Sequence, residues 1–171
     1  MRLVIQRVSE AHVNIEGSTV GQIQKGYMIL FGVSTEDELQ AQEHLIKHKE
    51  ELNACSFQNM PSIEWLVKKV IGLRIFDDDN GVMNRSIMDV QGDILVVSQF
   101  TLHALVKKGN RPSYIRAAGH DYAIPIYEGF CLALSKALGK PVQTGQFGAA
   151  MEVGLVNDGP VTILIDSNNR E

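Results

Sequence analysis

Residues 27–33, which read Tyr-Met-Ile-Leu-Phe-Gly-Val, form an unbroken apolar run that constrains the fold more than any other stretch of the chain. A strand with one solvated face alternates apolar and polar residues, whereas an unbroken run is typical of a strand buried on both faces. We therefore expect this segment to lie centrally in a sheet. The run Ile94 to Val97 predicts a second buried strand.

Shorter strand-like segments occur near both ends of the chain. At the amino end, apolar and polar residues alternate in residues 2–8 and 12–15, and a turn leads to a further strand at 20–23, which indicates antiparallel pairing. Near the carboxyl end we expect three strands, over residues 142–144, 151–156 and 161–165.

Helical spacing of apolar residues predicts three helices, over residues 36–54, 63–71 and 122–138. Residues 35–38, Thr-Glu-Asp-Glu, match a capping box at the start of the first helix. Strands and helices in this order predict an α/β fold, a single domain of layered mixed β-sheets with helices packed on one side. We place this domain at residues 1–166 and expect residues 167–171 to be a frayed tail.

Composition excludes several classes of protein. With 171 residues and 44% hydrophobic content, the chain is long and apolar enough for one domain with a sizeable core. No apolar run nears the roughly 20 residues of a membrane helix, so we expect a cytoplasmic protein with no membrane partner. Cys55 and Cys131 lack metal-ligand spacing. The acidic turn at 77–79 lacks the later carboxylate of a calcium loop, since Ile87 stands there. We expect no metal and no cofactor.

The net charge of −4 argues against non-specific capture of long nucleic acid, so we expect no DNA partner. One basic cluster nevertheless follows residue 102 in a loop that contains glycine and proline, and it consists of Lys107, Lys108, Arg111 and Arg116. Such a cluster is either a solvated loop or a local site for RNA phosphates.

Polar side chains follow the buried strand that ends at Val97. Ser98 and Thr101 offer hydroxyls, Gln99 offers a donor and an acceptor, and Phe100 offers a stacking face. Groups at this position in a sheet line a cleft at its carboxyl edge. A serine nucleophile needs an activating base, and His103 is poorly placed for that role along the chain. Covalent catalysis is therefore disfavoured.

A second unusual run, Asn157-Asp158-Gly159-Pro160, separates two strand-like pieces. Asp-Gly is typical of a tight hairpin turn, but proline lacks the N–H that a central strand needs. A plain surface turn is one interpretation. The other is a locally shaped backbone that closely approaches a ligand, because glycine has no side chain. The pattern leaves the isomer of the Gly-Pro bond undecided.

Several ordered motifs together closely resemble those of the D-aminoacyl-tRNA deacylase family, which is also called the D-tyrosyl-tRNA(Tyr) deacylase family. The motifs span nearly the whole chain, and they are Val4 to Val8, Leu73 to Phe76 with Met83-Asn84, Ser98 to Leu102, Lys108 to Ser113, Thr144 to Met151 and Leu155 to Thr162.

This resemblance implies a homodimeric hydrolase with active sites at the subunit interface. Its substrate would be an aminoacyl-tRNA acceptor end, and it would hydrolyse the ester between a D-amino acid and the 3′-terminal adenosine, as chiral proofreading in translation. In family terms Ser98, Gln99, Phe100 and Thr101 line the catalytic pocket. Gly159-Pro160 is cis and enters the partner's site to exclude L-amino acids. The resemblance gives supporting or adenosine-binding roles to Arg7, Phe147, Ala149, Asn157 and Thr162, and it leaves Lys107, Lys108, Arg111 and Arg116 as candidates for tRNA phosphates.

An aminoacyl ester is already activated, so orientation and N–H donors to the oxyanion suffice without a side-chain nucleophile. A rigid backbone wall that excludes L side chains leaves room for glycine, so we expect glycyl esters to be accepted. Two alternatives stay open: a related editing deacylase specific for L-alanine on tRNA, and a non-catalytic dimeric RNA-binding module. The chain departs from the family pattern in a longer segment at about 51–62 and in the residues from His103 to Val106.

Overall fold

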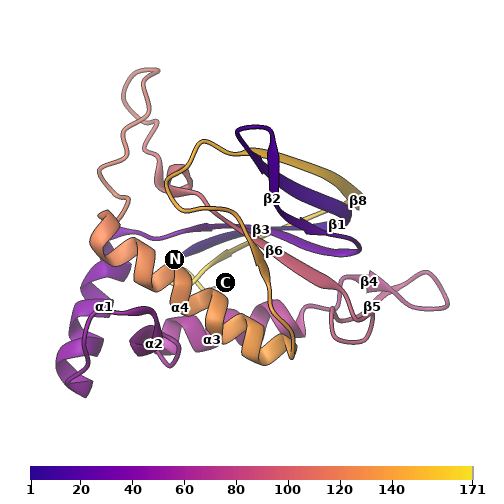
Figure 1. Ribbon diagram of the computed structural model, residues 1–171, viewed down its shortest axis with the longest axis horizontal. Coiled ribbons are helices and arrows are strands. Elements are labelled where there is room, and N and C mark those ends of the chain that lie inside the picture. The colour runs from indigo at the N-terminus through magenta and orange to yellow at the C-terminus, as the bar shows by residue number, and fades with distance from the viewer. Residues whose placement is uncertain (171) are drawn as a thin grey trace.

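The computed structural model describes residues 1–170 as one mixed sheet with four α-helices gathered on one side of it (Figure 1). The strands of this sheet are β1 (Arg2–Ile15), β2 (Ser18–Ile23), β3 (Gly26–Gly32), β6 (Asp93–Ser98), β7 (Gln143–Thr144) and β8 (Glu152–Asp166). The helices are α1 (Thr35–His48), α2 (Ala54–Phe57), α3 (Pro61–Gly72) and α4 (His120–Leu138). A separate hairpin, β4 (Phe76–Asp77) with β5 (Met83–Arg85), projects at one end (Figure 1).

Strand β1 organises the sheet because it pairs with three other strands. Its first half lies antiparallel to β3, its second half lies antiparallel to β2, and β8 runs along its other edge. Strands β6 and β7 continue the sheet beyond β3 in parallel pairing. The sheet then nearly closes, because β2 approaches β7 so tightly that a Cβ on Gly21 would lie 2.6 Å from the carbonyl oxygen of Thr144. One curved sheet therefore replaces the layered sheets that the sequence predicted.

Both faces of β3 are buried, as its sequence predicted. Tyr27, Ile29 and Phe31 point toward the helices, and Phe31 stacks on Phe130 of α4 with ring centroids 4.6 Å apart. Met28 faces the inside of the curved sheet, in a second core that also contains Leu95. Burial of a large apolar side chain contributes about 1.5–3 kcal/mol. The two cores together fix the position of the carboxyl end of β6.

The first predicted helix, 36–54, is wrong at both ends. The cap is Ser34, one residue earlier than expected, and its hydroxyl accepts from the N–H of Asp37 while the Asp37 carboxylate accepts from the N–H of Ser34. The helix stops at Lys49, whose left-handed backbone closes the last turn through its N–H to the carbonyl of Leu45. Asn53 then caps the short helix α2.

The two strands expected at 151–156 and 161–165 are one strand. Strand β8 pairs with β1 along nearly its whole length, and residues 158–161 bulge from it. The Gly-Pro run therefore interrupts a long strand locally and does not reverse the chain.

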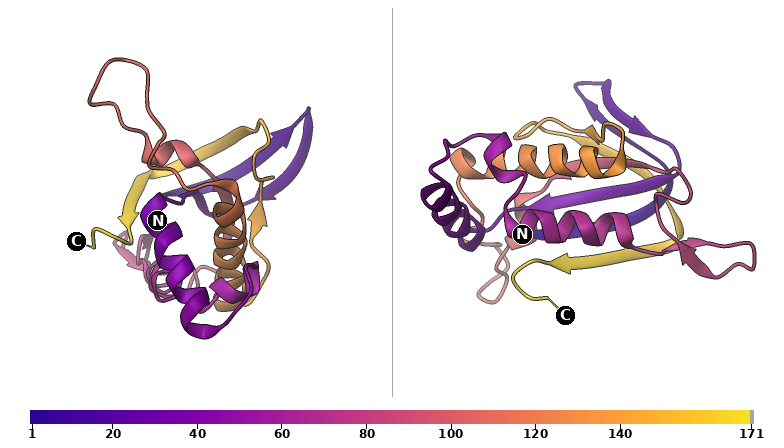
Figure 2. Two further views of the ribbon diagram at one scale, coloured as in Figure 1. Left: turned by 90° about the vertical axis from the view of Figure 1, so that its left-hand side faces the viewer. Right: turned by 90° about the horizontal axis from the view of Figure 1, so that it is seen from below.

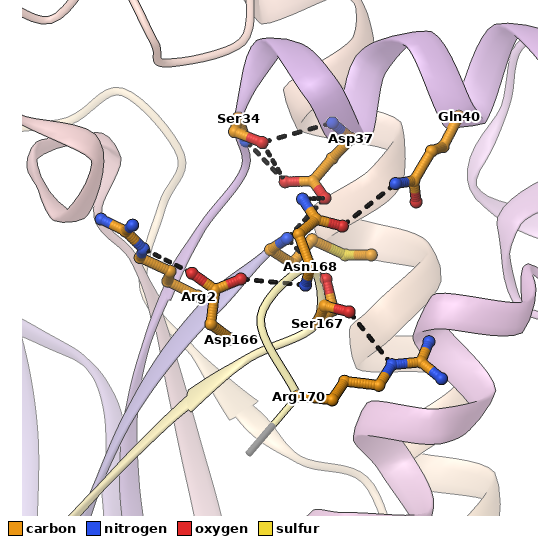
Figure 3. A network of polar contacts seen from close by, with 9 residues as sticks. Arg2, Ser34, Asp37, Gln40, Asp166, Ser167, Asn168 and Arg170 are labelled. Carbon is orange, nitrogen blue, oxygen red and sulfur yellow. Dashed lines mark hydrogen bonds and ion pairs between the residues drawn. The ribbon is translucent and has the colours of Figure 1, made fainter.

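In the predicted frayed tail, Ser167, Asn168 and Arg170 form hydrogen bonds, while Glu171 lies outside the described residues. The two ends of the chain meet beside the start of α1 (Figure 3). The Met1 amino group donates to Asp37 Oδ1 at 2.5 Å and to Ser167 Oγ at 2.7 Å, and the Met1 and Asp37 side chains are both fully buried. Asn168 donates to the same carboxylate at 2.9 Å. Burial lowers the pKa of the amino group, and the Asp37 carboxylate opposes that shift.

Within residues 1–170, no helix combines the length and the apolar character needed to cross a bilayer.

Candidate active site

A pocket of about 220 Å³ lies at the carboxyl end of β6. One wall comes from Ser98, Gln99 and Phe100, and the opposite wall comes from the turn after β7, with Phe147 and Ala149. These residues are about fifty positions apart in the chain. The family resemblance predicts both groups in one site, and the fold brings them together because β6 and β7 are parallel neighbours.

The end of β6 is held in a defined geometry. The Gln99 N–H donates to the carbonyl of Phe31 at 2.7 Å, and the chain then enters a short 3₁₀ helix, η1 (Phe100–His103). Thr101 does not line the pocket, but its hydroxyl accepts from the Gln99 side-chain amide at 2.5 Å. Thr101 thus orients Gln99, which does line it.

His103 does not serve the pocket. It is buried beneath a different cavity of about 360 Å³, which it lines with Arg2 and Arg116. Its Nε2 atom has no hydrogen-bond partner among residues 1–170, and burial lowers its pKa, which favours the neutral ring. Its position along the chain predicts that His103 is a poor base for Ser98, and in the structure the two residues line separate cavities.

Phe147 is fixed from behind by two aromatic side chains that the sequence analysis did not select. Tyr127 and His120, both on α4, contact it edge-on with ring centroids 5.8 Å and 5.9 Å away. The Tyr127 hydroxyl donates to the carbonyl of Val96 at 2.9 Å, which connects this wall of the pocket to β6. Tyr127 belongs to the apolar stripe of its helix, so its pattern predicted packing and gave no signal of a site.

The Gly-Pro loop stands opposite a single arginine. Gln6 pairs with Thr162 and Val8 pairs with Asn157, so residues 158–161 face Arg7 alone. The Gly159-Pro160 bond is cis, and both residues are exposed. Neither of them lines the pocket at β6.

Arg7 holds this loop from a buried position. Its side chain is 6% exposed, and its Nε donates to the carbonyl of Asp158 at 2.9 Å. Its Nη1 donates to the carbonyl of Ile75 at 2.6 Å and lies 3.3 Å from Asp77 Oδ1. The Asp158 and Asp77 carboxylates offset the charge of the buried guanidinium.

Asn157 and Thr162 close the base of the loop. Asn157 Oδ1 accepts from the N–H of Val161 at 3.0 Å, and Asn157 Nδ2 donates to the Thr162 hydroxyl at 3.3 Å. These bonds and those of Arg7 hold the loop against β1 and across its base. Gly159 and Pro160 remain exposed to solvent.

The basic cluster lies on the loop between η1 and α4, which projects away from the sheet and the helices (Figures 1 and 2). The side chains of this cluster are exposed, and within residues 1–170 none of them forms an ion pair; they are Lys107, Lys108, Arg111 and Arg116. Unpaired exposed cations suit a polyanion better than a folded-state role.

Comparison with known proteins identifies the class. The profile of the D-Tyr-tRNA(Tyr) deacylase family matches residues 4–166. The chain therefore belongs to the D-Tyr-tRNA(Tyr) deacylase family. Proteins named D-aminoacyl-tRNA deacylase are 56% identical in Phocaeicola vulgatus and 50% identical in Porphyromonas gingivalis, each over 171 residues that cover all of both chains.

Solved structures share the fold. One titled "c-Myc DNA Unwinding Element Binding Protein" superimposes with a TM-score of 0.79 at 36% identity, over 97% of this chain and 98% of that chain. A structure titled as a probable eukaryotic D-amino acid tRNA deacylase gives a TM-score of 0.69 at 17% identity, over 96% and 97% of the two chains. At that identity the second likeness concerns the fold alone.

Proposed function

We propose that this protein hydrolyses the ester between a D-amino acid and the 3′-terminal adenosine of tRNA. The observation that carries the proposal is the pocket that joins Ser98, Gln99 and Phe100 to Phe147 and Ala149. Family membership and the names of the full-length relatives support it.

The proposed chemistry needs no side-chain nucleophile. Water adds to the ester carbonyl, and the bond from the acyl carbon to the ribose oxygen then breaks, which gives a free amino acid and a 3′-hydroxyl. The first N–H groups of a helix have no intrahelical partners, so those at the start of η1 are suited to stabilise the oxyanion. Ser98 and Gln99 orient the substrate, while Phe147 and Ala149 contact the adenosine.

Selection against L-amino acids is assigned to the backbone of Gly159 and Pro160. In this proposal the loop of one subunit enters the pocket of a second copy, and its main-chain atoms occupy the place of an L side chain. Two features support the arrangement: the loop is exposed, and it does not line the pocket of its own chain. Arg7, Asn157 and Thr162 hold the wall in position.

The substrate profile tests the proposal. Purified protein is incubated with D-tyrosyl-, L-tyrosyl- and glycyl-tRNA, and the released amino acid is measured. We expect D-tyrosyl- and glycyl-tRNA to be cleaved and L-tyrosyl-tRNA to be spared, because only an L side chain meets the wall. Inert glycyl-tRNA beside cleaved D-tyrosyl-tRNA would contradict the wall. Cleavage of L-alanyl-tRNA but not of D-tyrosyl-tRNA would indicate alanine editing, and binding without cleavage would indicate an RNA-binding module.

The basic loop is proposed to bind tRNA phosphates. A triple variant, Lys107→Ala with Lys108→Ala and Arg111→Ala, should raise KM for aminoacyl-tRNA and reduce the slope of log affinity against log salt by about 2–3. Filter binding at several salt concentrations measures this slope. The matched control removes the same charge from exposed lysines at the end of α1 and on α3, with Lys47→Ala, Lys49→Ala and Lys68→Ala. An equal change in both triple variants would refute a local phosphate site.

A further inference from the structure

Two aromatic rings stand exposed at the edge of the pocket. Phe100 is 54% exposed and Tyr114 is 41% exposed, although both are large apolar rings. They contact each other edge to face, with centroids 5.0 Å apart and ring planes at 75°. We call them the aromatic pair. Water-exposed rings held against each other offer faces for a flat ligand.

The backbone holds Tyr114 in place. Leu105 and Ser113 exchange two hydrogen bonds, of 2.8 Å and 2.9 Å, at the base of the projecting loop. On the other side of Tyr114, the carbonyl of Arg116 accepts from the N–H of Thr35 at 3.0 Å. The ring is therefore carried by a short segment that is tied down at both ends, so ordering it on binding costs little entropy.

The chain segment that carries the aromatic pair has charged side chains of one sign only. Residues 94–120 contain no Asp and no Glu, whereas they contain Lys107, Lys108, Arg111 and Arg116. Stacking rings beside cations that follow a backbone are the arrangement by which proteins bind single-stranded nucleic acid. Specific RNA recognition likewise places unstacked bases on aromatic side chains.

We propose that the aromatic pair stacks the base of the nucleotide that precedes the terminal adenosine. This inference rests on the proposed function. Phe100 connects the pocket to the aromatic pair, because it lines the pocket and also contacts Tyr114. With the adenosine at Phe147 and Ala149, the chain of the RNA leaves the pocket past Phe100 and meets Tyr114 next. Tyr114 is then a specificity residue for RNA that takes no part in the chemistry.

The test compares two substrates that differ only in the RNA beyond the adenosine: D-tyrosyl-tRNA and 3′-O-(D-tyrosyl)adenosine. Tyr114→Leu keeps an apolar side chain and removes the ring face. Stacking contributes about 1–3 kcal/mol per base, so kcat/KM on the tRNA should fall by about 5- to 150-fold. On the adenosine ester it should stay at the wild-type value. Tyr114→Phe should retain activity on both substrates.

Ile115→Ala is the matched control, because Ile115 is the next residue in the same segment and is 77% exposed. It should leave both rates unchanged. An equal loss on both substrates in Tyr114→Leu would show that the ring supports the pocket, and an unchanged rate on tRNA would show that it stacks nothing. Either result overturns the inference while wild-type cleavage still supports the deacylase. If the wild type cleaves neither substrate, the proposed function fails as well.

Discussion

Gly159→Ala is expected to lower cleavage of D-tyrosyl-tRNA by about 100-fold or more while the protein stays folded. The backbone of Gly159 has φ +130, which L side chains rarely adopt, and an added Cβ would lie 2.8 Å from Val161 Cγ2 and 2.9 Å from Arg7 Nη2. The loop must shift to relieve these contacts, and a displacement of about 1 Å in a positioning element costs about that factor. The measurement is release of D- and L-tyrosine from the matched esters.

Gly17→Ala is the control for this substitution. Gly17 also has a positive φ, +77, but it lies in the turn between β1 and β2 with no atom within 4 Å of an added Cβ. Gly17→Ala therefore also places a side chain at a positive φ, but this residue lies outside the proposed wall, so activity should be unchanged. If Gly159→Ala were as active and as selective as Gly17→Ala, the backbone wall would be excluded.

Asp37→Asn is expected to destabilise the protein by about 3–5 kcal/mol, because it leaves a buried charge without its partner. The Asp37 carboxylate faces the Met1 amino group at 2.5 Å and also accepts from Asn168 and from the Ser34 cap. For a domain of this size the melting temperature should fall by about 6–20 °C. Calorimetry or circular dichroism during heating measures the change.

An exposed ion pair provides the comparison for Asp37. Asp79 lies 2.6 Å from Arg85, yet the Asp79 side chain is 88% exposed. Exposed pairs contribute little because water screens them. Asp79→Asn should therefore leave the melting temperature nearly unchanged. A similarly small change in Asp37→Asn would mean that the buried pair does not hold the chain ends together.

The pattern of apolar and polar residues along the sequence correctly predicted the features that depend on neighbouring side chains. The unbroken run at 27–33 predicted a strand buried on both faces, and Tyr27 and Met28 do lie in two different cores. The polar residues after Val97 were expected at the carboxyl edge of a sheet, which is where the pocket lies. In both cases side-chain polarity alone determines which way the segment faces.

The features that the sequence pattern did not predict depend on contacts between residues that are far apart in the sequence. A proline after Asp-Gly resembles a turn, but the pairing of Asn157 and Thr162 with β1 keeps β8 in one line. Residues 167–170 read as a tail because their partners, Met1 and Asp37, lie at the other end of the sequence. The sequence did not predict a role for Tyr114, because only the folded structure shows that its ring is exposed beside Phe100.

The pairing of β1 with β8 also has a consequence for synthesis on the ribosome. Arg7 is made 151 residues before Asp158, whose carbonyl it binds. Contacts of such sequence separation form late, since the loop entropy is lost before the contact is gained. On the ribosome Arg7 therefore stays without this partner until the segment around Asp158 has been made. The loop at Gly159 and Pro160 therefore gains its buried support late in synthesis, and chains that stop before Asp158 lack that support.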